Sequence, residues 1–347
     1  MCIGWGYNIN ITIKDIAKMA GVSHSTVSRS LNDSSRVKQE TKDKIQAIAE
    51  KFDFEFNAGA RSLSTRKTGT VGIIHPELYN DYSGSIFSNS LISEIMKRLD
   101  LAGIDSIPVF SENRENSSSN IRRLTRQQKV DAFIIVDSLV SVEDWKFISK
   151  FTIPTIQLHY RPKYKPPEEI NYIYSDNIVG GRLATDFLIE HGCKIIMCIT
   201  IKSEHPEILD RMEGFSLSMK QHNLDIDKNL IFEEECTLFN GEKIIRENRD
   251  KLNKIDGIFV HADIMALGVI KELEKIGYRV PEDIRVIGYD DIELGTYFTP
   301  RLTTIHQPKE VLAEKACGKL KEIMGRNPGS GHILQEVVSP YLIERES

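Results

Sequence analysis

The residues most able to bind another polymer lie together near the start of the chain. His24, Ser25, Ser28 and Arg29 are polar, and apolar Val27 interrupts them. Imidazole, hydroxyl and guanidinium groups can hydrogen-bond to the edges of DNA bases, and one arginine can donate two such bonds to a guanine. If these side chains share the outer face of a helix, that face can contact bases in the DNA major groove.

Two short helices are needed to position this polar face. Thr12 and Asp15 have the spacing of a capping box, which begins a first helix, and Gly21 permits the left-handed turn that ends it. Ser23 can cap a second helix. The pattern predicts a helix-turn-helix, and the alternative is an ordinary helical hairpin with a solvated face. The inner faces are supplied by apolar residues at helical spacing, namely Ile13, Ile16, Ala17, Ala20, Val27 and Leu31.

A third helix is predicted from about Gln39 to Phe52, because apolar residues recur on one face, and it completes a small domain over residues 11–56. Residues 57–68 follow as a short, weak helix and a linker, in which Gly59 costs about 1 kcal/mol relative to alanine. Residues 1–10 lack the basic and apolar segments of a secretion signal, and we expect them to form a disordered extension.

Charge is divided unequally along the chain. Residues 1–68 hold 11 Lys/Arg against 7 Asp/Glu, a net charge of +4, whereas the remainder carries −9. A basic head on an acidic body is typical of a DNA-binding domain joined to one that does not bind DNA. No apolar run reaches the roughly 20 residues that span a bilayer. The five cysteines lack metal-ligand spacing and fit a reducing compartment, so we expect a cytoplasmic protein without a metal site or membrane span.

From residue 69 onward, short apolar runs alternate with amphipathic helices. This alternation predicts an α/β body of parallel sheets covered by helices on both faces. About ten strands indicate two doubly wound lobes with a ligand cleft at the carboxyl ends of the strands. The expected boundaries are about 69–172 with 303–335 for lobe 1, and about 173–302 with 336–347 for lobe 2.

Motifs of enzyme active sites are not recognised in the sequence. It has no GxGxxG or GxxxxGK[ST] nucleotide motif, no HExxH zinc motif and no GxSxG nucleophile motif. His191 and His261 lack the partners of a catalytic triad and are interpreted as structural histidines. We expect no catalytic residue and no cofactor.

Several blocks of the sequence carry a specific resemblance. The segments TIKDIAKMAGVSHSTVSRSLN, VKQETKDKI and NAGARSL occur in that order and closely resemble the head and hinge of the LacI/GalR family of bacterial transcription regulators. Later blocks, including DNIVGGRLATDFLIEHG, RMEGF and residues 263–305, resemble its effector-binding body, which is periplasmic-binding-protein-like. The resemblance covers nearly everything after Asn10 and implies a DNA-binding regulator, most often a repressor. A solute-binding protein shares the body, but the head counts against that alternative.

The resemblance also implies which residues contact DNA. Residues 23–32 correspond to the recognition helix, with His24, Ser25 and Arg29 at base-contacting positions. Leu63 corresponds to the hinge leucine that inserts between base steps in the minor groove, and the hinge is expected to fold only when two copies pack over the operator. A helix cap or a solvated side chain is the alternative for each hydroxyl, and Leu63 alone would be an apolar linker residue. The remaining DNA-binding positions are Thr12, Ser23, Ser28, Asn32, Arg36, Thr41 and, in the hinge, Asn57.

In the body, Arg211 and Asp290 match the arginine and aspartate that hold hydroxyls of a sugar-like effector. An interlobe salt bridge is the alternative for this pair. Tyr82 can stack on a sugar ring or pack in the core. Three positions depart from the family pattern and alter the walls of the cleft: His159 replaces an acidic or amide residue, Ala262 precedes the retained Asp263, and Cys236 replaces an aromatic residue for which Phe239 can substitute.

These departures leave the effector open: a sugar or sugar derivative, a phosphorylated sugar, a non-sugar, or a protein corepressor in its place. The chain ends at Ser347 without the heptad helix of the family's tetramers, so a homodimer on a pseudo-palindromic operator is expected. The effector is expected to change the angle between the lobes, which requires that it bind the two states differently.

Overall fold

The computed structural model describes residues 11–31, 34–54, 67–75, 82–113, 117–137, 139–161, 169–203, 205–325 and 333–347, with the side chains of the helix that begins at Tyr82 described from Ile86. The chain divides into two compact units, one ending at Gly69 and the other comprising Thr70–Ser347. We call them the head and the body and describe each by itself.

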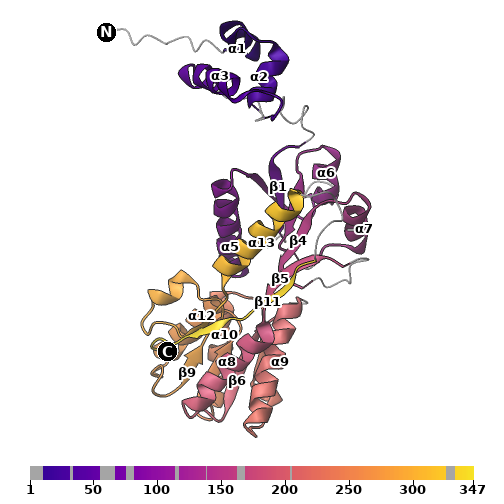
Figure 1. The fold of residues 1–347 in the computed structure, drawn as a ribbon. Coiled ribbons are helices and arrows are strands. Elements are labelled where there is room, and N and C mark those ends of the chain that lie inside the picture. The colour runs from indigo at the N-terminus through magenta and orange to yellow at the C-terminus, as the bar shows by residue number, and fades with distance from the viewer. Residues whose placement is uncertain are drawn as a thin grey trace, which may run out of the picture. The chain divides into compact units, whose positions relative to one another are not determined.

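The described part of the head contains the helices α1 (Ile13–Ala20), α2 (His24–Leu31) and α3 (Gln39–Lys51) (Figure 1). The predicted capping box is confirmed: the N–H of Asp15 donates to Thr12 Oγ1 at 3.4 Å, and the N–H of Thr12 donates to Asp15 Oδ2 at 2.9 Å. Gly21 ends α1 with a φ of +70°, as its position predicted. These local devices set the angle between α1 and α2 without needing a large core.

The core of the head is small and draws on all three helices. Ile16, Val27 and Ile45 are completely buried, one from each helix. Lys44 adds a polar tie, because its Nζ donates to the carbonyl of Ala20 at 3.0 Å and so satisfies the C-terminal end of α1. Since α2 turns Val27 inward, the polar residues His24, Ser25 and Arg29 face outward, whereas Ser30 is buried.

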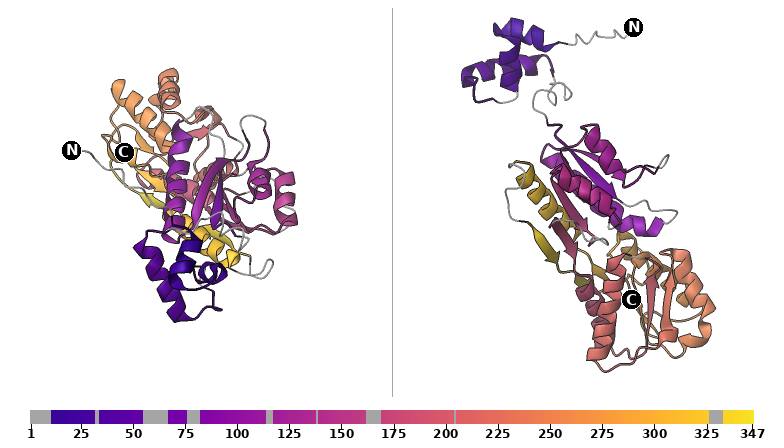
Figure 2. Two further views of the ribbon diagram at one scale, coloured as in Figure 1. Left: turned by 90° about the horizontal axis from the view of Figure 1, so that it is seen from above. Right: turned by 90° about the vertical axis from the view of Figure 1, so that its right-hand side faces the viewer.

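Lobe 1 of the body is a six-stranded parallel sheet in the order β11-β5-β4-β3-β1-β2. All four residues of β3 are buried, as expected for a strand covered on both faces. Helices α5 and α13 pack on one face and α6 and α7 on the other (Figures 1 and 2). The elements are β1 (Thr70–His75), α5 (Tyr82–Leu101), β2 (Asp105–Phe110), α6 (Asn120–Arg126), β3 (Ala132–Ile135), α7 (Val142–Lys150), β4 (Thr155–His159), β5 (Asn171–Ser175), α13 (Lys309–Met324) and β11 (Gln335–Val338).

Lobe 2 is built around a four-stranded parallel sheet in the order β7-β6-β8-β9. Helices α8 and α9 pack on one face and α10 and α12 on the other, and an antiparallel pair, β10-β12, contacts α8. The elements are α8 (Asn177–Glu190), β6 (Ile196–Ile201), α9 (Pro206–Gln221), η1 (Lys228–Leu230), β7 (Ile231–Glu234), α10 (Leu238–Glu247), α11 (Arg249–Leu252), β8 (Gly257–Val260), α12 (Asp263–Lys275), β9 (Arg285–Ile287), η2 (Glu293–Thr296), β10 (Thr304–His306) and β12 (Tyr341–Ile343).

The two parallel-sheet lobes confirm the predicted fold class, but the chain changes lobes later than the expected boundaries at 172, 302 and 335. Strand β5 stays in the sheet of lobe 1 up to Ser175, and β11 does so up to Val338. Strand β10 packs in lobe 2, where Ile305 joins the core beside α8. Hydrophobic periodicity locates a strand, but only pairing decides which sheet it joins.

None of the described helices is long and apolar enough to cross a bilayer.

Helices α8 and α9 approach each other closely because glycines lie at their contact. A Cβ added to Gly214 would lie 2.2 Å from the carbonyl oxygen of Ile178, and one added to Gly181 would lie 2.2 Å from the carbonyl oxygen of Arg211. Both neighbouring atoms belong to helix backbones, which cannot move away as a side chain can. This close packing places the first turns of α9 against α8.

We predict that Gly214→Ala lowers the free energy of unfolding of the body by about 1–3 kcal/mol, because the added methyl group forces the helices apart. Gly318→Ala is the matched control, since Gly318 lies within α13 and a Cβ added there would have no atom within 4 Å. That change should be neutral or stabilise by up to about 1 kcal/mol. Urea denaturation of both variants measures the difference, and equal stability would contradict the close approach of α8 and α9.

Candidate DNA-binding face and effector site

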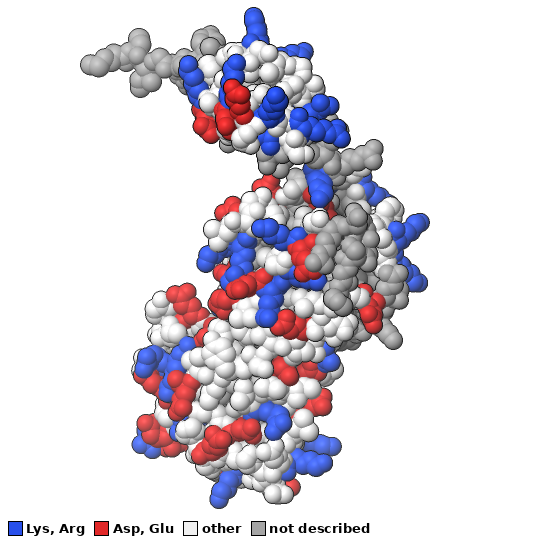
Figure 3. All heavy atoms as spheres, viewed as in Figure 1, with Lys and Arg blue, Asp and Glu red and all other residues white. Residues whose placement is uncertain are grey.

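The outer face of α2 presents the polar residues expected to contact bases. His24, Ser25 and Arg29 are exposed, whereas Val27 on the opposite side is completely buried. On the face drawn in Figure 3, the charged side chains of the head are mainly Lys and Arg, whereas the body shows both signs. An exposed guanidinium beside small hydroxyl and imidazole groups can approach a base edge without first breaking an internal contact.

Two of the expected DNA-contacting hydroxyls, those of Ser23 and Thr12, cap helices of the head. Ser23 Oγ accepts from the backbone N–H of Thr26 at 3.1 Å and lies 2.8 Å from Ser25 Oγ. Thr12 caps α1 as described. Among the other expected phosphate contacts, Arg36 is exposed and Ser28 and Thr41 are half-buried. Asn32, Asn57 and Leu63 lie outside the described residues.

In the body, Arg211 lies at the junction of the two lobes and is 4% exposed. Its Nε donates to Asn177 Oδ1 at 3.0 Å, and its Nη1 donates to the carbonyl of His261 at 2.5 Å. The guanidinium also lies over the ring of Tyr289, 3.8 Å from its centroid. Contacts from α8, from the end of β8 and from the segment after β9 therefore hold this side chain in one orientation.

Asp290 compensates the charge of Arg211, with 3.6 Å between Oδ1 and Nη2. Burial raises the pKa of Asp290 to about 6, although Arg211 acts in the opposite direction. Its backbone has a φ of +114°, a strained value for an aspartate. Gln307, in the connection from β10 to α13, donates from Nε2 to Asp290 Oδ1 at 2.7 Å. The structure thus brings together the two residues on which the sequence prediction relied most.

His159 ends β4 and faces the same junction. It is 3% exposed, with a φ of +70°. Burial, together with the charge of Arg211, lowers the pKa of His159 to about 3, so its imidazole is neutral at physiological pH. Its ring packs against Phe87 from α5 and against Tyr160. The structure therefore puts His159, Arg211 and Asp290 in one cluster.

Three further residues of this cluster were not found from the sequence. Arg161 of lobe 1 donates from Nη2 to both oxygens of Asp210 in α9, at 2.5 and 2.6 Å, and so bridges the lobes. Glu207, one turn before Arg211 on α9, is 7% exposed, and burial raises its pKa to about 8. The sequence held one signal for this cluster. Residues 207, 210 and 211 lie at i, i+3 and i+4, so they share one face of a helix.

The other expected effector contacts lie elsewhere or have partners within the fold. Both oxygens of Asp263 are used: Thr304 Oγ1 donates to Oδ1 at 2.6 Å, and the N–H of Ile292 donates to Oδ2 at 2.9 Å. Phe239 is 62% exposed on α10, with Arg246 over its ring. The side chain of Tyr82 lies outside the described part of the structure. Asp263 thus holds the loop that presents Asp290.

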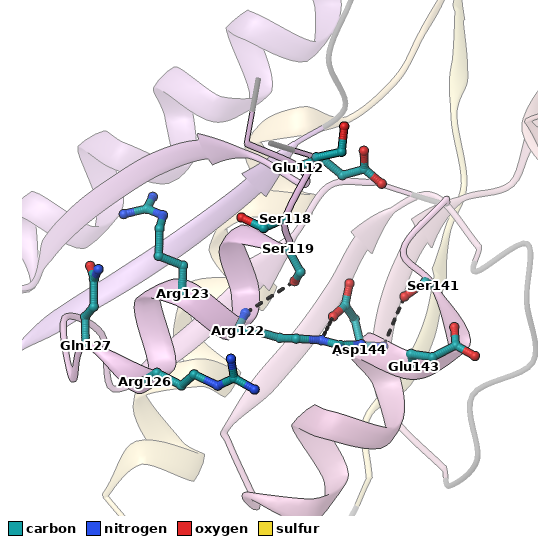
Figure 4. A pocket seen from close by; sticks show the side chains of 11 residues that line it. Glu112, Ser118, Ser119, Arg122, Arg123, Arg126, Gln127, Ser141, Glu143 and Asp144 are labelled. Carbon is teal, nitrogen blue, oxygen red and sulfur yellow. Dashed lines mark hydrogen bonds and ion pairs between the residues drawn. The ribbon is translucent and has the colours of Figure 1, made fainter. Parts of the chain in front are cut away.

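A separate pocket of about 650 Å³ lies on lobe 1 between α6 and α7 (Figure 4). Arg122 Nε donates to Asp144 Oδ1 at 2.6 Å across it. Its three arginines face three carboxylates, so the lining carries no formal net charge, and we assign it no role. Among the described residues, no group of three or more His, Cys, Asp or Glu is placed to hold a metal ion. The charged residues of the pocket are Glu112, Arg122, Arg123, Arg126, Glu143 and Asp144.

Comparison with known proteins gives matches to the head and to much of the body. The family described as "Bacterial regulatory proteins, lacI family" matches residues 12–57, and "Periplasmic binding protein-like domain" matches residues 185–347. The ribose operon repressor of Escherichia coli strain K12 is 30% identical over 337 residues, which are 97% of this chain and 99% of that protein.

Two solved structures are similar to this chain over almost its whole length. The complex of the transcriptional regulator CelR with cellobiose is 25% identical, with a TM-score of 0.69 over 97% of this chain and 99% of that one. A lac repressor dimer bound to operator and the anti-inducer ONPF is 23% identical, with a TM-score of 0.79 over 97% and 98%. This last likeness supports the fold alone.

We predict that Asp263→Ala lowers the free energy of unfolding of the body by about 1–3 kcal/mol, because it leaves the N–H of Ile292 and the hydroxyl of Thr304 buried without an acceptor. Asp250→Ala, at an exposed position on α11, is the control and should change stability little. Chemical denaturation compares the two variants. Equal effects would show that Asp263 does not support this loop.

Proposed function

The chain belongs to the LacI family of bacterial regulatory proteins, and on that premise we propose that its head binds a pseudo-palindromic operator through α2 while its body responds to a small effector. It is a DNA-binding transcription repressor of this family and not an enzyme. The observation that carries the proposal is the exposed polar face of α2, which the buried Val27 orients outward.

Within the head, Arg29 is proposed as the main base-contacting residue, assisted by His24 and Ser25. The exposure of all three supports this assignment. Thr12, Ser23, Ser28, Asn32, Arg36, Thr41 and Asn57 are proposed to contact phosphates or sugars, which orient the protein on the duplex without selecting sequence. A hydroxyl that caps a helix can still donate its proton to a phosphate, so capping by Ser23 is compatible with this role.

We further propose a homodimer, because two heads related by a two-fold axis match two half-sites of an operator. The lac repressor, which has the same fold, is described as a dimer bound to operator. Residues 57–68 would then form the hinge, with Leu63 entering the minor groove between base steps. A regulator of transcription acts where the chromosome lies, so we place the protein in the bacterial cytoplasm.

The effector site is proposed at the junction of the lobes, around Arg211, Asp290 and His159. These side chains come from α9, from the loop after β9 and from the end of β4, so a ligand that touches all three contacts both lobes. Such a ligand can favour one lobe angle over another. Tyr82 and Phe239 remain proposed effector contacts, and Asp263 is proposed to act by holding the loop of Asp290.

We predict that Arg29→Ala weakens binding to the selected operator by about 1–3 kcal/mol and relaxes the base preference at one position per half-site. Binding to unrelated DNA should fall much less, because phosphate contacts remain. Operator selection from a random library followed by fluorescence anisotropy measures both effects. Lys254→Ala, which removes one positive charge from the body, is the control, and a variant that selected the wild-type operator would exclude Arg29 as a base-contacting residue.

Leu63→Ala should lower operator affinity by about tenfold or more, because the proposed wedge between base steps is lost. Effector affinity should stay within about twofold, since the residue lies outside the body. Anisotropy on operator DNA and calorimetry with the effector separate the two effects. If operator affinity were unchanged, the hinge would bind DNA without this wedge.

A further inference from the structure

Resting on the effector site proposed above, we propose that this site selects an uncharged small molecule rich in hydroxyl or N–H donors and rejects its phosphorylated form. Glu207 is the specificity-determining residue in this proposal. Three features of the junction carry it: buried polar atoms without a partner, cations that already have carboxylate partners, and a buried glutamate among them.

The first feature is a set of unsatisfied polar atoms. Glu207 Oε2, His159 Nδ1 and Gln307 Oε1 are buried and have no hydrogen-bond partner in the described structure. Gln307 shows that the ligand must donate a hydrogen bond at this point. Its Nε2 already donates to Asp290, and its unpaired Oε1 can only accept. Buried polar atoms of this kind are normally satisfied, so a ligand that donates to Gln307 Oε1 and exchanges hydrogen bonds with Glu207 and His159 would complete them. A phosphate dianion has acceptors and no proton to donate.

The second feature concerns positive charge. Among the described residues, the Lys and Arg side chains whose charge acts on Asp290, Glu207 or His159 are Arg161, Arg211 and Lys309. Each has a carboxylate: Asp210 for Arg161, Asp290 for Arg211, and Glu310, 3.8 Å away, for Lys309. A phosphate that approached the buried Arg211 would therefore have to displace Asp290 and leave a buried charge uncompensated. At the more exposed Arg161 and Lys309 it would compete with a carboxylate that is already in place.

The third feature is the protonation state of Glu207. Its carboxyl lies in the first turn of α9, and its Oε1 lies 3.8 Å from His205 Nδ1. Burial raises the pKa of Glu207 to about 8, so the side chain is mostly a neutral carboxylic acid at pH 7. A neutral acid can donate one hydrogen bond and accept another, which suits a hydroxyl or an amide-like heterocycle. Its neutral form adds no positive charge beside Asp290 and Asp210, so nothing in Glu207 favours an anion over a neutral ligand.

The first experiment uses matched pairs of compounds on the full-length protein. Neutral pentoses, hexoses, disaccharides, nucleobases and nucleosides are each compared with their phosphorylated counterparts by thermal shift and then by calorimetry. We expect at least one neutral compound to raise the melting temperature and its phosphate ester to bind at least about tenfold more weakly. A phosphate ester that binds as tightly as its neutral parent would overturn the proposal, and so would a panel without a neutral ligand.

Operator binding in the same preparation separates this inference from the proposed function. If a phosphorylated compound alters operator affinity, the regulator and its effector site stand and only the choice of a neutral ligand falls. If the intact protein binds no operator from a random library, the proposed function falls, whatever the ligand panel shows.

The second experiment tests Glu207 itself with the neutral compound found above. Glu207→Ala should weaken its binding by about tenfold or more, because donor and acceptor are both lost, whereas Glu207→Gln should stay within about threefold, since an amide also donates and accepts. Glu213→Gln, exposed on the same helix, is the control and should have no effect. Melting curves without ligand confirm that each variant is folded.

Two outcomes would contradict the role of Glu207. Unchanged affinity in Glu207→Ala would remove this residue from the site. A loss in Glu207→Gln as large as that in Glu207→Ala would mean that an ionised carboxylate contacts the ligand, which a neutral-ligand site does not require.

Discussion

The organisation of the body depends on a positive charge buried where its lobes meet. A guanidinium that is 4% exposed is stable only if its charge is compensated and its N–H groups have acceptors. Asn177, the carbonyl of His261 and the ring of Tyr289 surround Arg211, and Asp290 supplies the opposite charge. Asp290 reaches that position with a strained backbone, which the buried side chain of Asp263 supports through the neighbouring loop.

The same arrangement would let the proposed effector site both bind a ligand and respond to it. The contacts of Arg211 lie within lobe 2, whereas Arg161 and Tyr160 from lobe 1 meet Asp210 and His205 at α9. A ligand that satisfies the free atoms of His159 and Glu207 would act on both sides of this boundary. The free energy that it gains depends on the distance between the lobes, and that dependence is what an effector requires.

The head solves a different problem, because it must be stable with few buried residues and still expose polar ones. The capping box at Thr12, the left-handed Gly21 and the cap at Ser23 stabilise the helix ends locally. From α2 the small core takes the buried Val27 and the partly buried Leu31, and Ser30 is buried as well. Because local capping stabilises the helix ends, His24, Ser25 and Arg29, which are proposed to contact bases, can stay exposed.

The sequence by itself determined the features that depend on neighbouring residues: the capping box, the turn at Gly21, the strand–helix alternation and the charged head. Family resemblance added Arg211 and Asp290. Only the tertiary structure decided which strands share a sheet, that Asp263 serves a loop while Phe239 is exposed, and that Glu207 and Arg161 join the cluster. These facts depend on burial and on contacts between segments far apart in the chain. Local sequence patterns do not predict them, because the protonation state and the contacts of a carboxylate depend on the residues that surround it in the folded protein.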